Sequence, residues 1–268
     1  MVAFAGNSLL ARIALKLTQT EATTFTVVRL LSGAVTLWAL VRLRSSARPM
    51  GGTFPGALVL FTYAITFSFA YVGLSAATGA LILFGAAQST MIGHGVWKGE
   101  RMGPGPLAGL AIALAGLVVL LLPGATAPDA LPALLMLVAG VAWGAYCLLG
   151  ASAVDPLGVT AGNFVRCAPL ALAAAVVMLP RLRIDAGGLA CAVFSGAIGS
   201  GICYAVWYTV VARISTISAS VMQLTIPPIA AVAGALLLGE MITGRLLLAS
   251  AAVLGGVAAV VLRQARRR

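Results

Sequence analysis

Two glutamine side chains carry the clearest potential for binding chemistry in this sequence. Gln88 and Gln223 each lie near the middle of a long apolar stretch. In a membrane protein, a polar group at mid-bilayer depth costs roughly 3 kcal/mol unless it faces protein or water. Two amides that face one cavity would bind a carboxylate or an amine; alternatively, each joins two helices through hydrogen bonds. The sequence leaves both interpretations open.

Aromatic rings and further polar groups in other apolar stretches extend this set. Rings near helix ends are explained by the membrane interface, whereas deeper rings suit the wall of a mixed apolar and polar pocket. Arg29 and Arg166 lie roughly two turns inside their stretches. There, each either extends its charge to the interface or binds a substrate carboxylate. The predicted substrate-binding residues are Asn7, Tyr63, Phe84, Gln88, Trp143, Tyr146, Arg166, Tyr204, Trp207 and Gln223.

Groups for proton coupling, catalysis or metal binding are scarce. His94 is the only histidine, and it is either a proton relay or a packed helix residue. The six acidic residues fall at predicted helix ends or in loops, so a buried carboxylate for ion coupling is absent. The chain has neither His-Glu-x-x-His nor Gly-x-Ser-x-Gly, and its four cysteines lie in apolar runs without Cys-x-x-Cys. We therefore predict that the protein is not an enzyme and has no catalytic residues, metal site or cofactor.

Proline and glycine predict special helix geometry at two places. Pro227 and Pro228 interrupt an apolar stretch, and we expect the break to act as a hinge. Gly109 and Gly116 in one stretch and Gly256 in the last stretch predict close helix contacts. These small-residue faces would meet within a monomer or between the copies of a homodimer.

The elements that must position these residues are membrane-spanning helices. The 268 residues are 61% hydrophobic and 9% charged, with a mean hydropathy of +1.08, whereas a soluble domain has about 25% charged residues. A spanning helix needs about 20 apolar residues, so ten spans would use most of the chain and leave no soluble domain. The net charge of +11 comes from basic residues at the ends of apolar runs and in the tail. This pattern indicates contact with lipid rather than with nucleic acid.

Charges, prolines and glycines divide the chain into ten predicted spans. The short connections between them require neighbouring helices to be antiparallel. We expect the first span to belong to the mature protein rather than to a signal peptide, and its length of about 17 residues leaves open whether residues precede it. The spans are 1–17, 23–42, 55–73, 76–97, 104–122, 130–149, 157–179, 187–211, 214–238 and 244–263.

The two halves of the chain resemble each other. The dipeptide Gly99-Glu100 recurs as Gly239-Glu240, and the segment 23–29 is similar to 160–166. Internal repeats of this kind indicate two diverged copies. Because each copy has five spans, an odd number, the second must enter the membrane in the opposite orientation. We therefore predict an all-α polytopic fold of ten transmembrane helices, as two inverted five-helix repeats at 1–124 and 125–268.

Lysine and arginine predict the orientation of the chain. With both termini in the cytoplasm, the inner side holds ten basic residues and the outer side five. Short cytoplasmic loops carry an excess of lysine and arginine. We therefore expect a multi-pass protein of a bacterial-type inner membrane with both termini cytoplasmic.

Several motifs give the chain a family resemblance along its whole length. The segments 4–8 and 142–144, with the paired dipeptides Gly99-Glu100 and Gly239-Glu240, resemble the EamA family of the drug/metabolite transporter superfamily. The resemblance implies ten helices, a central cavity formed by the first four helices of each half, and peripheral fifth and tenth helices. Members of this family commonly export amino acids and related metabolites, and its YddG-like branch favours aromatic amino acids.

These observations favour one function over two alternatives. We predict a transporter that exports small metabolites, most simply amino acids with aromatic or hydrophobic side chains, by alternating access through a central cavity. The same cavity chemistry would suit a carrier of nucleosides, sugars or drugs. A membrane scaffold is the alternative outside transport, and it would not need paired amides inside the membrane.

Overall fold

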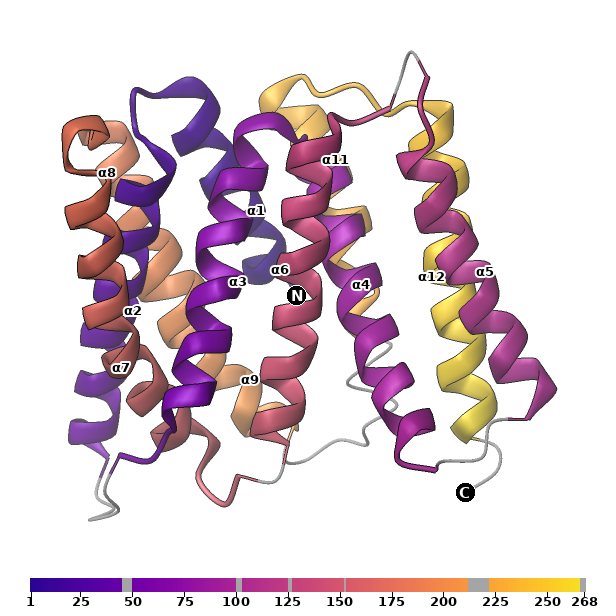
Figure 1. The fold of residues 1–268 in the computed structure, drawn as a ribbon, viewed down its shortest axis with the longest axis horizontal. Helices are drawn as coiled ribbons and strands as arrows, with labels where there is room; N and C mark the ends of the chain where they lie inside the picture. Colours follow the sequence, from indigo (N-terminus) through magenta and orange to yellow (C-terminus); the bar gives the residue numbers. More distant parts are fainter. Residues whose placement is uncertain (45–49, 100–102, 125–126, 152, 212–221, 266–268) are drawn as a thin grey trace.

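A computed structural model describes the chain except for residues 45–49, 100–102, 125–126, 152, 212–221 and 266–268. The regular structure of the described residues is helical, and they contain no strand. Figure 1 shows a bundle of roughly parallel and antiparallel helices. They are α1 (Val2–Leu17), α2 (Ala22–Leu43), α3 (Phe54–Gly73), α4 (Ala76–Trp97), α5 (Pro104–Leu121), α6 (Ala130–Gly150), α7 (Pro156–Val177), η1 (Leu179–Arg181), α8 (Ala186–Phe194), η2 (Ser195–Ile202), α9 (Cys203–Val211), α11 (Ile226–Leu238) and α12 (Gly244–Ala265).

Eight helical segments of the described residues are long and apolar enough to cross a membrane. They are α2 to α7, the continuous run from α8 into α9, and α12. Two further α-helices, α1 with 16 residues and α11 with 13, are shorter. The ninth predicted span, 214–238, lies partly outside the described residues. The predicted helical, multi-pass membrane protein is confirmed.

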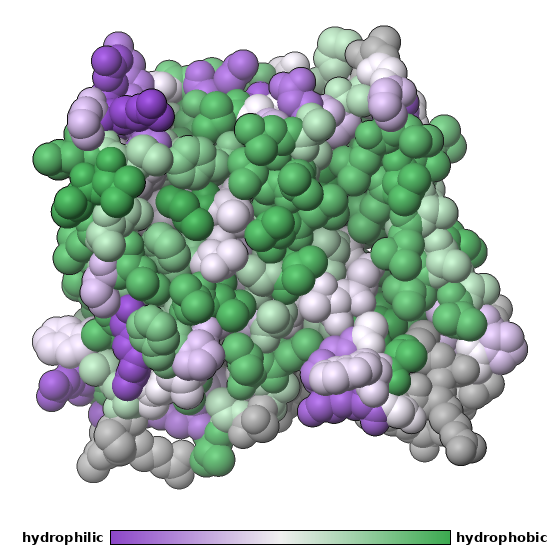
Figure 2. Space-filling view, in the orientation of Figure 1, coloured by the Kyte–Doolittle hydropathy of each residue, from purple (hydrophilic) through white to green (hydrophobic). Residues whose placement is uncertain are grey.

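The surface has the layout of a membrane protein. Figure 2 shows apolar side chains across the middle of one face and polar side chains gathered towards its upper and lower edges. The upper end of Figure 1 is formed by the helix ends at which α1 is followed by α2, α3 by α4, α5 by α6, α7 by α8, and α11 by α12. The ends between α2 and α3, α4 and α5, and α6 and α7 form the lower end.

Polar side chains at these ends cap the helices. Glu21 accepts hydrogen bonds from the first amides of α2, Thr53 from Gly56 in α3, and Asp185 from Gly188 in α8. A side chain that accepts from the first turn satisfies an otherwise unpaired backbone N–H. This capping explains why Glu21 and Asp185 lie directly before a helix.

The packing of helices crosses between the two halves of the sequence. In the second half, α6 packs on α3 and α4 of the first; in the first half, α1 packs on α8, η2 and α11 of the second. The helix α2 lies against α7, and α5 against α12. Figure 1 shows α5 and α12 side by side at one edge of the bundle.

Glycine faces hold α5 and α12 together. A methyl group added to Gly109 would lie 2.7 Å from the carbonyl oxygen of Gly256, and one on Gly116 would lie 2.8 Å from Ala252. Real Cβ atoms do not approach other atoms so closely, so only glycine allows the two backbones to meet. The predicted close contact therefore forms within one chain, which covers these faces. The oligomeric state stays a prediction.

The eighth span contains a π-helical segment. Between α8 and α9, the segment η2 has the sequence Ser-Gly-Ala-Ile-Gly-Ser-Gly-Ile. A methyl group on Gly196 would clash with the backbone oxygen of Arg29 in α2, and one on Gly199 would lie 3.2 Å from Asn7 in α1. The glycines thus allow α1 and α2 to approach this segment closely. Such π-helical segments occur often at functional sites.

Candidate functional site

The centre of the bundle holds a cluster of aromatic rings from four helices. We call it the central aromatic cluster: Phe4 of α1, Tyr63 and Phe67 of α3, Trp143 and Tyr146 of α6, and Tyr204 and Trp207 of α9. Trp143 is its hub, with ring centroids 5.0 Å from Tyr63, 5.5 Å from Tyr204 and 5.9 Å from Tyr146. These separations are typical of interacting aromatic pairs.

Most of the predicted aromatic residues meet in this cluster. The structure brings together Tyr63, Trp143, Tyr146, Tyr204 and Trp207, which come from both halves of the sequence. The sequence prediction omitted Phe4 and Phe67. Phe67 lies one helical turn after Tyr63, and this spacing could have identified it. A joint role of the five predicted residues in substrate binding stays a prediction.

Asn7 lies beside the cluster, at the contact between α1 and η2. Its side chain is 6% exposed and accepts a hydrogen bond from the Ser195 hydroxyl. Because Ser195 belongs to the π-helical segment, this bond fixes α1 to the irregular part of the eighth span.

The two predicted glutamines differ in their surroundings. Gln88 is 2% exposed in α4, one turn after the buried Phe84, and its Nε2 finds no acceptor. Gln223 lies just before a break in the helix, the turn at residues 224 and 225, and its buried Oε1 finds no donor among the described residues. Trp143 Nε1 is also buried without an acceptor. Unpaired buried polar atoms are rare, and each is able to bind a ligand atom.

Arg29 is the most unusual charged residue of the bundle. It is 2% exposed and is the largest of the fully buried side chains. Its Nη2 donates to the Tyr63 hydroxyl at 2.9 Å, and its guanidinium lies 4.7 Å from the centre of the Phe67 ring. Its Nη1 finds no acceptor. The sequence prediction weighed Arg29 but retained only Arg166 as a binding residue.

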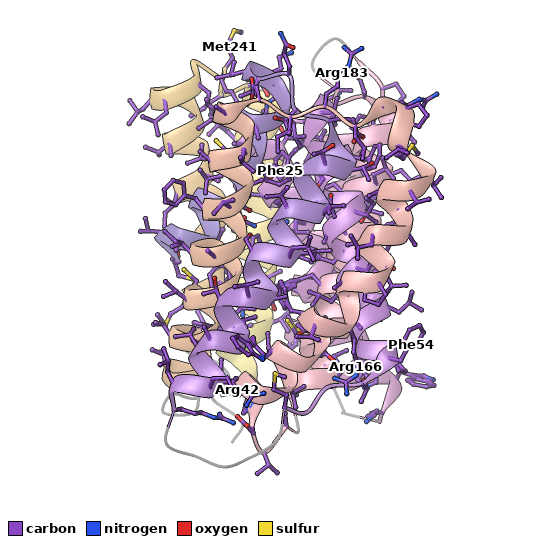
Figure 3. The ribbon with its side chains drawn as sticks, turned by 90° about the vertical axis from the view of Figure 1, so that its left-hand side faces the viewer. Phe25, Arg42, Phe54, Arg166, Arg183 and Met241 are labelled. Carbon is purple, nitrogen blue, oxygen red and sulfur yellow. The ribbon has the colours of Figure 1, made fainter. Side chains whose placement is uncertain are left out.

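Arg166 has a different position, near the lower end of the bundle. It is exposed, and its Nη1 donates to the carbonyl oxygens of Gly51 at 2.7 Å and Gly162 at 3.0 Å. Figure 3 shows it near Phe54 and on the level of the lower loops. The structure therefore does not bring Arg166 into the central aromatic cluster, and it matches the interface interpretation of this residue.

A cavity of about 230 Å³, with a mostly apolar lining and a few polar side chains, lies between the lower parts of α3, α6 and α7. Tyr146 of the central aromatic cluster lines it, together with Thr53, Thr160 and Asn163. The Asn163 amide donates weakly to the Tyr146 hydroxyl at 3.4 Å and accepts from the Thr53 N–H at 2.8 Å. Asn163 was not among the predicted residues, although an amide inside an apolar stretch was the available signal.

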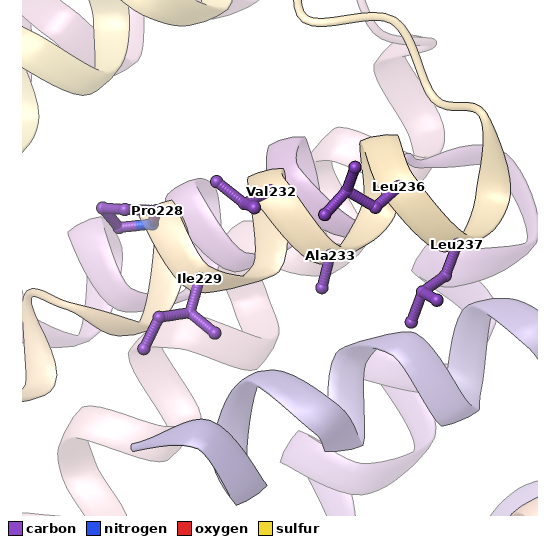
Figure 4. A pocket seen from close by; sticks show the side chains of 6 residues that line it. All are labelled: Pro228, Ile229, Val232, Ala233, Leu236 and Leu237. Atoms are coloured by element: carbon purple, nitrogen blue, oxygen red, sulfur yellow. The ribbon is translucent and has the colours of Figure 1, made fainter.

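A second hollow, of about 460 Å³, lies along α11 and is lined by apolar side chains alone. Figure 4 shows Pro228, Ile229, Val232 and their neighbours on this helix. It offers no group for a polar ligand. The two prolines occupy the first turn of α11, directly after the break at 224 and 225, where a missing N–H costs nothing. Their role as a hinge stays a prediction.

His94 lies near the lower end of α4 and is partly exposed. Its ring is 5.8 Å from that of Trp97, a ring contact rather than an ion pair. Within the described residues no group of three or more histidine, cysteine, aspartate or glutamate side chains could hold a metal ion. The role of His94 as a proton relay stays a prediction.

Charged pairs lie at the two ends of the bundle. At the upper end Arg12 donates to Glu240 at 3.0 Å, and at the lower end Arg44 pairs with Asp155. The hydrogen bond with Asp155 raises the pKa of Arg44 above its usual value. At the upper end, backbone N–H groups that donate to Asp185 lower the pKa of its carboxyl. Both pKa shifts favour the charged form of the group.

Comparison with known proteins gives three findings. The EamA-like transporter family matches residues 130–262 of the chain. An uncharacterized protein of Pseudomonas aeruginosa is 51% identical over 97% of this chain and 91% of its own length. A probable terminal-alkyne amino-acid exporter of Streptantibioticus cattleyicolor is 29% identical over 80% of this chain and 73% of its own length.

The fold also has a solved counterpart. A crystal structure with no function in its description superposes on the chain with a TM-score of 0.67, covering 98% of this chain and 97% of the other. The two sequences are 20% identical. This likeness shows a shared fold.

Proposed function

The chain belongs to the EamA-like transporter family, and from this premise we propose that it exports amino acids, in particular those with aromatic or hydrophobic side chains. It is a multi-pass membrane transporter. The relative from Streptantibioticus cattleyicolor, named as an amino-acid exporter, supports amino acids as the substrate class.

The observation that carries the proposal is the combination of aromatic rings and unpaired donors at the centre of the bundle. Trp143 and Tyr63 offer apolar surface, while Gln88 Nε2 and Trp143 Nε1 offer buried N–H groups without acceptors. Ligand sites are mostly apolar with a few placed polar groups that fix orientation. An amino acid with a large side chain meets both requirements, since its side chain packs on rings and its carboxylate accepts hydrogen bonds.

We propose that two inverted five-helix repeats, 1–124 and 125–268, enclose this site. The pattern of helix contacts supports two repeats. The first helix of the second half, α6, meets α3 and α4 of the first half, and the first helix of the first half, α1, meets α8, η2 and α11 of the second half. An axis that relates the halves would exchange these two sets of contacts. The distribution of basic residues supports cytoplasmic termini in a bacterial inner membrane.

The proposed transport mechanism is alternating access. The break at residues 224 and 225, directly before Pro227 and Pro228, would let α11 change its angle. The charged pairs at the two ends would then separate in turn. With buried carboxylates absent from the spans, we propose a facilitator, and a pH gradient that drives flux would instead direct attention to His94.

Flux into proteoliposomes tests the function. Radiolabelled amino acids, nucleosides and sugars are offered to the intact protein, to Gln88→Ala and to Gln223→Ala, with and without a pH gradient. The matched control is Leu236→Ala, a side chain that is 79% exposed on α11. Saturable amino-acid flux that falls at least tenfold in the glutamine variants, but not in the control, is expected. Flux of another class would reassign the substrate, and no flux would favour a scaffold.

A further inference from the structure

Beside the central aromatic cluster lies one positive charge, that of Arg29, which no acidic side chain of the described residues pairs with. Arg29 is buried in α2, and the two ion pairs of the described residues, Arg12 with Glu240 and Arg44 with Asp155, do not involve it. The acid closest to it in the sequence, Glu21, accepts from the first amides of its own helix. A buried cation without a counter-ion is strongly unfavourable, because it loses hydration and gains no opposite charge.

The surroundings of Arg29 compensate this charge only in part. Tyr63 accepts one hydrogen bond, and the rings of Phe67 and Tyr63 lie 4.7 Å and 5.3 Å from the guanidinium carbon. The faces of aromatic rings attract a cation. One amino group of the guanidinium, Nη1, still has no acceptor among the residues that the structure describes. A planar guanidinium with a free N–H suits a carboxylate, which it can bind with two parallel hydrogen bonds.

The position of Arg29 is fixed by close packing of its helix. A methyl group on Gly196 in η2 would overlap the backbone oxygen of Arg29, so α2 lies directly on the π-helical segment. Ser195 of the same segment donates to Asn7. The arginine is therefore held where α2, α3 and the irregular eighth span converge.

The equivalent arginine of the second half provides the contrast. Arg166 donates to two backbone carbonyl oxygens and lies at the exposed lower end. Its Nη1 has two acceptors in the protein, and the residue is exposed. Of the two repeat-related arginines, Arg29 alone combines burial with an unused donor.

We infer that Arg29 binds the carboxylate of the transported molecule, with the side chain of that molecule against Tyr63 and Trp143. This inference rests on the proposed function and sharpens it, because it names the group that a substrate must carry. Molecules that keep the aromatic body but lose the carboxylate should bind weakly. Molecules that keep the carboxylate but lose the amine should still bind.

A ligand series on the intact protein tests the inference without relying on any variant. Tryptophan fluorescence of the protein in nanodiscs follows the binding of L-phenylalanine, 3-phenylpropionate, L-phenylalaninamide and phenethylamine. We expect the two carboxylates to bind at least tenfold more tightly than the amide and the amine. Equal affinities across the series, or no binding of either carboxylate, would overturn the role of Arg29.

Variants then assign the effect to this residue. Arg29→Gln should remove the preference for carboxylates, and Arg29→Lys should retain part of it because the charge remains. The matched control is Arg42→Gln, because Arg42 lies on the same helix, is exposed and also contacts a ring, that of Trp38, at 5.4 Å. Size-exclusion profiles identify folded preparations. A folded Arg29→Gln protein that keeps the full preference would contradict the inference.

The outcomes also separate this inference from the proposed function. If the intact protein transports amino acids but Arg29→Gln is selective as before, the function stands and the inference fails. If 3-phenylpropionate binds through Arg29 but amino acids are not transported, the carboxylate site stands and the substrate class changes.

Discussion

Among the described residues, one ion pair lies at the upper end of the bundle and one at the lower end, and the two pairs differ in their surroundings. At the upper end, Arg12 and Glu240 have side chains that are 12% and 13% exposed. Arg12 also donates to the carbonyl oxygens of Tyr71 and Val72, and the second oxygen of Glu240 accepts from the Ala76 N–H. The pair therefore joins α1, the end of α3, the start of α4 and the connection that follows α11.

At the lower end, Arg44 and Asp155 are 24% and 19% exposed. Asp155 also caps α7 through the Gly158 N–H, so the pair joins the end of α2 to the start of α7. Water weakens this attraction more than the one at the upper end. The ion pair at the upper end should therefore stabilise the closed bundle more than the ion pair at the lower end. Under the proposed alternating-access mechanism, the lower end should separate at the smaller cost.

The largest effect is expected from Glu240→Gln. The change leaves Arg12 charged and without its partner while the side chains stay mostly buried, which should cost about 2 kcal/mol of stability. A loss of this size corresponds to roughly 4–8 °C in the melting temperature. Thermal unfolding in detergent measures it, with the exposed neighbour Met241→Ala as control. An unchanged melting temperature would show that the upper pair contributes little.

Arg12→Lys should have an intermediate effect. Lysine keeps the charge but cannot reproduce the fixed fork that reaches Glu240 and two carbonyl oxygens together. We expect a loss of about 1.5 kcal/mol by the same measurement. A lysine variant as stable as the parent would mean that charge alone, without the fork, holds this end.

Asp155→Asn at the lower end should cost less, about 1 kcal/mol, because the pair is more exposed. Asparagine retains a capping oxygen for α7, so the loss reports mainly on the pair with Arg44. Its cost should also shrink in high salt more than that of Glu240→Gln does. Val154→Ala, at an 89% exposed position, is the control. A larger loss than at the upper end would reverse the comparison.

The smallest effect is expected at Asp185, whose contribution should depend on pH. Its carboxyl pKa is lowered from an ordinary value of 3.8 by hydrogen bonds from the Gly188 and Gln19 N–H groups. A lowered pKa in the folded state contributes stability above the unfolded pKa, and that stability is lost as the pH falls through the folded value. The difference in the free energy of unfolding between the parent and Asp185→Ala should therefore be constant from about pH 7 to 5 and become smaller below about pH 4. A gap that widens in acid would contradict this assignment.

The sequence predicts the helices of this bundle closely but predicts fewer of the contacts between them. The predicted span 76–97 coincides with α4, and 23–42 differs from α2 by one residue at each end. Charges, prolines and capping residues determine where a helix leaves the membrane, and they are readable one stretch at a time. Five aromatic residues of the central aromatic cluster were predicted for the same reason, since a deep ring is unusual within a single stretch, whereas Phe4 and Phe67 were not.

The fates of Arg29 and Arg166 could not be predicted in this way. Both lie at similar depth in their own helices, and the sequence offers the same two interpretations for each. The position of each arginine depends on neighbours far along the chain. Arg29 donates to the Tyr63 hydroxyl and lies over the Phe67 ring, whereas Arg166 donates to the carbonyl oxygen of Gly51. The π-helical segment η2 was missed as well, because serine, glycine and alanine there permit several helix types.

The pairing of α5 with α12 has a consequence for how the chain is made. Synthesis proceeds from the N-terminus at roughly 5–20 residues per second, and about 120 residues separate the end of α5 from the start of α12. About 6–24 seconds therefore pass between the synthesis of α5 and that of α12, the helix that covers its glycine face. During this interval the newly made first half has no permanent neighbour for that face. Assembly of this helix pair thus depends on α12, which leaves the ribosome long after α5.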